Sequence, residues 1–375
     1  MGTIRCSYSD NWGLDLRMSL ISAFISHQVW LQRNASHEVS ELEPFIQQMR
    51  DDVRKQVLQF GDDNRTRQNL EKLLRDLEDI LDGITTDWQD KLTEDLQALG
   101  GYEADWTTKT LTANVDAEFV TPSPEQVWSA AKWNPMPLGD KPTDLFGLMK
   151  GWEDTEVNRL VTGVKMGFVQ GKTTRQIVKE VVGAGGLADI SQRNAAALVR
   201  TAVNHVSTQA KDVTYEKNKD IVEGYELVVT LDSRTSAICR SWPPKKVYKL
   251  TDEYQPKPPF HVACRTTTAP VISSEFDFLD KGAKRAAKGA EGGTQVAADT
   301  SYYDFFAQQP AWWQDKAIGP VRGAIFRNAG MSPEEFRAAS VDGFNRPMTL
   351  AEMAEADKRV AEYLSKIGYK INLGE

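Results

Sequence analysis

The chain has 375 residues, with 45 Lys and Arg against 53 Asp and Glu, a formal net charge of −8 and 41% hydrophobic residues. These values are typical of an acidic globular protein of two or three domains, and they exclude a protein devoted to coating nucleic acid. The mean hydropathy is −0.46. The most apolar early stretch, residues 18–31, contains polar side chains such as Ser22 and Gln28, so it falls short of the about 20 apolar residues that span a membrane. We therefore expect no contact with a membrane.

The cysteine content indicates a reducing compartment. The three cysteines, Cys6, Cys239 and Cys264, are too few to form a disulfide framework in a chain of this length. The first six residues lack the apolar region of a signal peptide, and Cys6 stands where a myristoylation signal needs Ser or Thr. We expect the protein to be made in a reducing cytosol.

Two long stretches near the N-terminus, residues 42–60 and 70–99, have apolar side chains at helical spacing. Neither stretch is interrupted by proline, because none lies between Phe45 and Val120. We predict two or three long amphipathic helices that pack as a hairpin or bundle. These helices would form an N-terminal helical domain over residues 1–110.

A connecting segment with several prolines is predicted over residues 111–150, with one short helix capped by Ser123. Residues 151–272 then form a central module that begins with helices. Ser191 is expected to cap the longest of these helices, which carries Asn204 and Thr208 on a polar face. Three strands of a short sheet are predicted over residues 225–232, 245–250 and 264–272. A short capped helix is predicted between the first two, over residues 232–240.

The C-terminal part begins with residues 273–300, which are rich in Lys, Ala and Gly, and we interpret them as a mobile linker. Residues 301–375 are predicted to be a C-terminal helical region. Capping boxes mark three helix starts along the chain, at Thr173 with Gln176, Ser332 with Glu335, and Thr349 with Glu352. The fold class is therefore α+β and mostly helical, with an N-terminal long-helix hairpin or bundle, a small central α+β module with a short sheet, and C-terminal helices.

One cluster in the central module has the residue types of a metal site: Asp232, Cys239, His261 and Cys264. The His-x-x-Cys pair follows two prolines, and a turn there can place imidazole and thiolate at the roughly 2.0 to 2.3 Å that zinc requires of each ligand. A structural zinc ion is one hypothesis, and half-buried residues of a small sheet are the alternative. A metal-dependent enzyme is a further alternative, although no Glu or second His follows at a usable offset to act as general base.

A second cluster, Lys281, Lys284, Arg285 and Lys288, places four cations within eight positions. Such a segment can contact DNA phosphates without sequence preference. A solvated linker is the alternative interpretation.

Several motifs keep a family order and spacing: residues 199–204 in a helix, 231–235 with Cys239 shortly after, 258–265, 302–310, 319–322 and 346–350. Together they resemble the phage Mu F-like head morphogenesis family over residues 153–355. Residues 261–264 read His-Val-Ala-Cys, whereas His-Pro-Asn-Cys is common in the family.

The resemblance implies a minor capsid protein of a tailed bacteriophage, present in few copies and associated with the portal. It would act in head assembly, genome packaging or genome ejection, without enzymatic activity; a metal-dependent hydrolase built on the Asp, Cys, His and Cys cluster is the alternative. Implied partners are the portal protein, the major capsid or scaffolding protein, and packaged DNA. The implied location is the virion, in the capsid interior or at the portal vertex, after synthesis in the host cytoplasm. We expect the N-terminal helices to dock on the portal.

Overall fold

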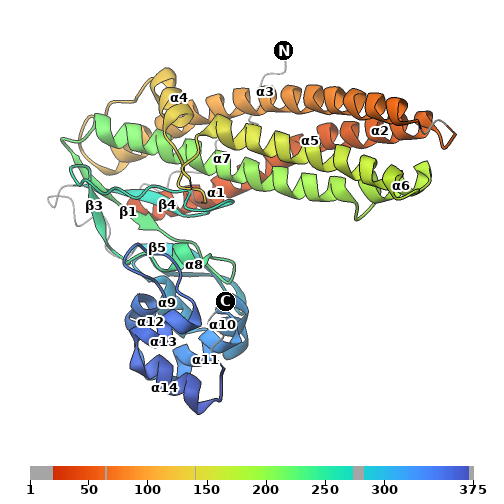
Figure 1. The fold of residues 1–375 in the computed structure, drawn as a ribbon. Coiled ribbons are helices and arrows are strands. Elements are labelled where there is room, and N and C mark those ends of the chain that lie inside the picture. The colour runs from red at the N-terminus through yellow and green to blue at the C-terminus, as the bar shows by residue number, and fades with distance from the viewer. Residues whose placement is uncertain (1–19, 64–65, 140, 273–282, 371–375) are drawn as a thin grey trace.

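The structure, a computed structural model, describes residues 20–63, 66–139, 141–272 and 283–370. Figure 1 shows an elongated body of helices, a sheet region beneath one end of it, and a group of short helices below the sheets. The predicted α+β, mostly helical architecture is confirmed. Within the described residues, no helix has both the length and the apolar character needed to cross a membrane.

The helical body, our name for α1 to α7, is built from long amphipathic helices. It comprises α1 (Leu20–Glu41), α2 (Glu43–Phe60), α3 (Arg67–Asn114), α4 (Pro124–Trp133), α5 (Leu145–Val169), α6 (Thr174–Val182) and α7 (Leu187–Lys217). Helices α3, α5 and α7 run side by side along its length (Figure 1). The predicted caps at Ser123 and Thr173 are present, each as a complete capping box. The predicted cap at Ser191 is wrong, because α7 begins at Leu187 and the Ser191 hydroxyl donates to Glu156 instead.

One large hydrophobic core runs through most of the helical body. It includes Leu31 of α1, Leu81 of α3, Leu160 of α5 and Val199 of α7. The boundary predicted at residue 110 therefore does not fall between two cores, and α3 continues through it to Asn114. The N-terminal helices are an integral part of the body because their apolar stripes are buried by the helices of the predicted central module.

The first sheet contains the strands that the sequence predicted most directly. β1 (Val222–Val228) lies between β3 (Val247–Lys249) and β4 (Thr267–Ile272), and both neighbours are antiparallel to it. Tyr225 of β1 stacks on its cross-strand partner Tyr248, with ring centroids 5.7 Å apart. The sheet lies against α1 and α7.

The second sheet corrects the predicted linker over residues 273–300. Residues 273–282 lie outside the described residues, but β5 (Lys284–Gly289) and β6 (Gly292–Ala297) form an antiparallel hairpin. Gly292 adopts a φ of 111° at the turn, a conformation that glycine takes without steric cost. The short strand β2 (Leu231–Asp232) pairs in parallel with β5. Lys284, Arg285 and Lys288 therefore lie in a strand that pairs with β6 and with a strand some fifty residues earlier in the chain.

The C-terminal lobe, our name for α9 to α14, packs around an aromatic core. It comprises α9 (Tyr302–Ala307), α10 (Ala311–Ile318), α11 (Pro320–Asn328), α12 (Pro333–Ala339), α13 (Leu350–Ala356) and α14 (Lys358–Lys366). Phe326 meets Phe306 and Phe336 edge-on, with centroids 4.8 and 5.1 Å away. The capping boxes predicted at Ser332 and Thr349 are confirmed. Leu231 and Ala287 share this core, so the second sheet packs with the lobe.

Candidate metal centre

A one-turn helix, α8 (Ala237–Arg240), carries the first residue of the cluster, Cys239. The hydroxyl oxygen of Ser236 caps this helix by accepting a hydrogen bond from the Cys239 backbone N–H at 3.2 Å. The helix lies within the segment 232–240, where the sequence predicted a short capped helix. Its cap fixes the position of the Cys239 side chain at the point where the chain leaves the second sheet.

A tight turn over residues 261–264 supplies the other two residues. The Cys264 N–H donates to the His261 carbonyl at 3.1 Å, and Ala263 takes a positive φ of 55°. The Ala263 N–H also donates to the hydroxyl of Thr201 on α7 at 2.8 Å. This turn places the His261 and Cys264 side chains on the same side, and α7 holds it in place.

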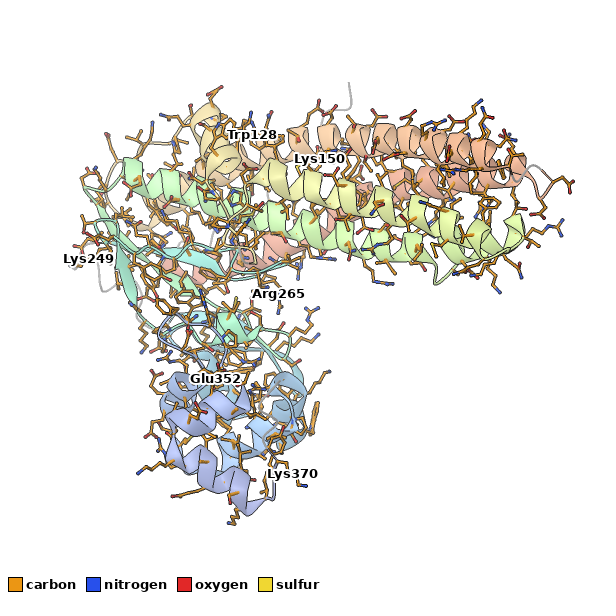
Figure 2. The ribbon with its side chains drawn as sticks, in the orientation of Figure 1. Trp128, Lys150, Lys249, Arg265, Glu352 and Lys370 are labelled. Atoms are coloured by element: carbon orange, nitrogen blue, oxygen red, sulfur yellow. The ribbon has the colours of Figure 1, made fainter. Side chains whose placement is uncertain are left out.

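The structure brings Cys239, His261 and Cys264 together, with one potential ligand atom from each within 4.8 Å of the others. The Cys239 Sγ is 3.2 Å from His261 Nε2 and 3.6 Å from Cys264 Sγ. Both cysteines are buried and His261 is half-buried. Arg265, the residue after Cys264, marks this place in Figure 2, at the junction between the helical body and the C-terminal lobe.

The orientation of the imidazole is set by its other nitrogen. Nδ1 of His261 lies 2.9 Å from the carbonyl of Val262, which fixes Nδ1 as the donor. Nε2 faces the cysteines, 3.2 Å from Cys239 Sγ, and the Ser236 hydroxyl oxygen lies 2.7 Å from it. Sequence analysis missed Ser236 and Thr201, because nothing in a linear pattern marks a hydroxyl as the neighbour of a turn 25 or 62 residues later in the chain.

The pKa values of the two thiols are shifted in opposite directions. Burial raises the pKa of Cys264, but hydrogen bonds from Cys239 and His261 outweigh it and hold that pKa well below its ordinary value. The hydrogen bond to Cys264 and burial raise the pKa of Cys239. For His261, burial acts downward, yet the Cys264 thiolate raises the pKa overall. Thiolate sulfur and imidazole nitrogen are the ligand types that zinc prefers, and here they converge in a largely buried position.

Asp232, the predicted fourth ligand, does not join this group. Its carboxylate is held by both terminal nitrogens of Arg265, at 2.5 and 2.8 Å, and accepts the backbone N–H of Arg234 at 2.9 Å. Burial raises the pKa of Asp232, but the bonds from Arg265 outweigh it and lower the pKa below its usual range. The carboxylate is thus a structural anion that pairs with the residue next to Cys264.

The basic cluster predicted to contact DNA is only partly available. Lys281 lies outside the described residues, whereas Lys284 and Lys288 are exposed on one face of β5. Arg285 points to the opposite face, where it is buried and donates to the backbone carbonyl of Val229. The prediction that Arg285 contacts DNA is wrong, because side chains alternate across a strand and its guanidinium serves the core. Burial lowers the pKa of Arg285 to about 10.

Comparison with known proteins identifies a family for part of the chain. Residues 158–269 match the family model described as Phage Mu protein F like protein. The match runs from α5 to β4 and contains all three residues of the candidate metal centre, so the resemblance found in the sequence is confirmed. No curated protein and no solved structure matches the chain. The match supports the assignment of this chain as a phage head morphogenesis protein that is located in the virion.

Proposed function

We propose that this chain, through its Phage Mu F-like domain, is a low-copy minor capsid protein that joins the head at the portal. There it acts in head assembly, genome packaging or genome ejection. The observation that carries the proposal is the family match over residues 158–269. Before assembly the protein resides in the host cytoplasm, and after assembly it lies in the capsid interior or at the portal vertex.

The helical body is the part that we propose docks on the portal protein, or on the major capsid or scaffolding protein. Its far end exposes large apolar side chains near the ends of two helices. Leu58 of α2 is 45% exposed and Val169 of α5 is 67% exposed. Helix α6 packs against both helices at this end (Figure 1). Exposed apolar side chains on helix ends favour contact with a groove between helices of a partner.

The hydrolase alternative receives no support from the site. Among the described residues, the group that could hold a metal consists of Cys239, His261 and Cys264 and contains no carboxylate. A metal hydrolase needs a general base near the bound water, and the one carboxylate that the sequence offered for this cluster, Asp232, is paired with Arg265. The described residues of the cluster therefore lack the general base that a metal hydrolase requires.

The portal proposal is tested by co-purification of this chain with the portal protein encoded by the same phage or prophage. Leu58→Asp combined with Val169→Asp should abolish co-purification, because a charge buried at an apolar contact is costly. Val120→Asp is the matched control, since Val120 is also exposed, at 56%, but lies outside the helices, before α4. If the wild type, the double variant and Val120→Asp all bind the portal protein equally, the far end of the body is not the docking surface.

A further inference from the structure

We propose that Cys239, His261 and Cys264 bind one Zn²⁺ ion, and that the ion clamps the turn at residues 261–264 to α8. This clamp would fix the junction between the helical body and the C-terminal lobe. The inference concerns a binding site and its mechanical role, and it stands independently of the proposed place of the protein in the head.

The spacing of the three ligand atoms fits a tetrahedral zinc site. Zinc bonds of about 2.3 Å to sulfur and about 2.0 Å to nitrogen give tetrahedron edges of about 3.8 Å between two sulfurs and about 3.5 Å between sulfur and nitrogen. The corresponding distances are 3.6 Å between the sulfurs of Cys239 and Cys264, and 3.2 Å from Cys239 Sγ to His261 Nε2. Both distances are within a few tenths of an ångström of the tetrahedral edges, and all three ligand atoms lie within 4.8 Å of one another.

The surroundings prepare the ligands for a metal. The bond from His261 Nδ1 to the Val262 carbonyl is the outer hydrogen bond that orients metal-binding imidazoles and fixes their tautomer. Two sulfurs and a nitrogen are donors that select zinc over the hard cations magnesium and calcium. The Ser236 oxygen, 2.7 Å from Nε2, lies beside the group, so this hydroxyl or a water can fill the fourth position.

A disulfide between Cys239 and Cys264 is the competing interpretation of two neighbouring thiols. It requires the sulfurs to approach to about 2.05 Å, whereas they lie 3.6 Å apart. The convergence of Nε2 on Cys239 Sγ, only 3.2 Å away, favours the metal.

The ion would lie between two parts that are separately anchored. On one side, the turn is tied to α7 of the helical body through the bond from Ala263 to Thr201. On the other side, the C-terminal lobe contacts α8 and the residue after it: Asn345 donates to the Ile238 carbonyl at 3.2 Å, and Arg337 donates to the Ser241 carbonyl at 2.7 Å. Arg240 of α8 donates in turn to the carbonyl of Ala317 in α10 at 3.1 Å. A bond between Cys239 and the turn therefore couples the lobe to the body.

The binding step is tested on the full-length protein by elemental analysis and by Co²⁺ substitution after chelation. We expect one zinc per chain, and a thiolate-to-cobalt charge-transfer band when Co²⁺ is added to the metal-free protein. His261→Ala and Cys264→Ser should lose both signals, while Cys6→Ser, which removes the remaining cysteine, should keep both. Absence of zinc and of the cobalt band in the wild-type protein would overturn the proposal. So would one free thiol in the unreduced, denatured chain, since that count shows a disulfide.

The clamp is tested by hydrogen exchange on the wild-type protein before and after chelation. Removing zinc should speed exchange in residues 236–242 and 261–265 and in the lobe segments that contact α8, and adding zinc back should restore protection. Exchange in the remote helix α6 should be unaffected and serves as the internal control. If zinc binds and is removed without any change in hydrogen exchange at the junction, the clamp is contradicted. This experiment does not depend on whether the variants fold, because it uses only the wild-type protein.

Discussion

The guanidinium of Arg265 holds the carboxylate of Asp232 with two hydrogen bonds, Nη2 to Oδ1 at 2.8 Å and Nη1 to Oδ2 at 2.5 Å. The Arg265 side chain is 20% exposed and that of Asp232 only 9%. Because Arg265 follows Cys264 and Asp232 lies on β2, this pair ties the turn of the candidate metal centre to the second sheet. It also satisfies the carboxylate that the sequence offered as a fourth metal ligand.

Replacing Asp232 with Asn should therefore destabilise the fold without removing metal. The change leaves the Arg265 charge partly buried and unpaired, so we expect the free energy of unfolding to fall by roughly 2–4 kcal/mol. Denaturant unfolding and elemental analysis measure the two effects. The control is Asp299→Asn, because Asp299 forms an exposed ion pair with Lys245, and such pairs contribute at most about 1 kcal/mol. Loss of zinc from a stable Asp232→Asn protein would instead make Asp232 a ligand.

The buried imidazole of His205 should make the helical body sensitive to acid. Its Nε2 lies 2.9 Å from the Ala131 carbonyl, and burial lowers the pKa of His205 to about 4. Since the unfolded chain takes up this proton near pH 6.5, the contribution to stability is complete above that pH and is lost as pH falls through about 4.

We expect His205→Gln, which keeps an N–H donor, to flatten the fall in unfolding free energy between pH 6.5 and 4.5 by about 2 kcal/mol. Denaturant titrations at several pH values provide the measurement. His37→Gln is the control, because His37 is exposed on α1. An identical pH slope in the wild type and in His205→Gln would show that His205 does not bind a proton on unfolding in this range.

Deleting residues 1–106 should unfold the helical body. The deletion removes α1, α2 and most of α3, and with them Leu81 and Trp88 of the shared core. Buried apolar residues of α5 and α7 would be exposed to water, at a cost far above the marginal stability of a domain. Circular dichroism and thermal unfolding of the truncated chain, alongside the full chain, check this result. A truncated protein that unfolds cooperatively would restore the N-terminal helices as a separate domain.

Of the basic cluster, Lys284 and Lys288 are the described residues whose side chains are exposed and can contact packaged DNA. Replacing both with Gln should reduce the slope of log affinity against log salt concentration by about 2, because each neutralised phosphate contributes roughly 0.9. Fluorescence anisotropy with a DNA duplex at several salt concentrations gives the slope. The matched control is Lys109→Gln with Lys150→Gln on the helical body. If the two double variants show the same salt slope, β5 has no specific role in binding DNA.

Local features were predictable from the sequence because they depend on neighbouring residues. The cap at Ser123 and the capping boxes at Thr173, Ser332 and Thr349 involve residues only three positions apart, and all four are present. The Cys239, His261 and Cys264 group was also predictable, since the two prolines and the short helix confine where these side chains can point.

Features that depend on distant parts of the chain were not predictable. Asn204, assigned to a polar face, is buried against the first sheet, where its amide donates to the Thr266 carbonyl at 3.2 Å. The hairpin of β5 and β6 resembles a linker in composition, but its two strands pair with each other and β2 adds a third strand from far along the chain. Arg265 was not singled out as the partner of Asp232, since charged residues at that separation give no pairing signal.

Quantitative mass spectrometry of purified procapsids and mature particles is the most direct test of a head protein. The particles should come from the phage or prophage that encodes the chain, with the major capsid and portal proteins measured in the same samples. We predict that peptides from this chain are present in both kinds of particle, at a copy number close to that of the portal and far below that of the major capsid protein. Abundant chain in the infected cells, with none in particles at any stage of assembly, would contradict the assignment.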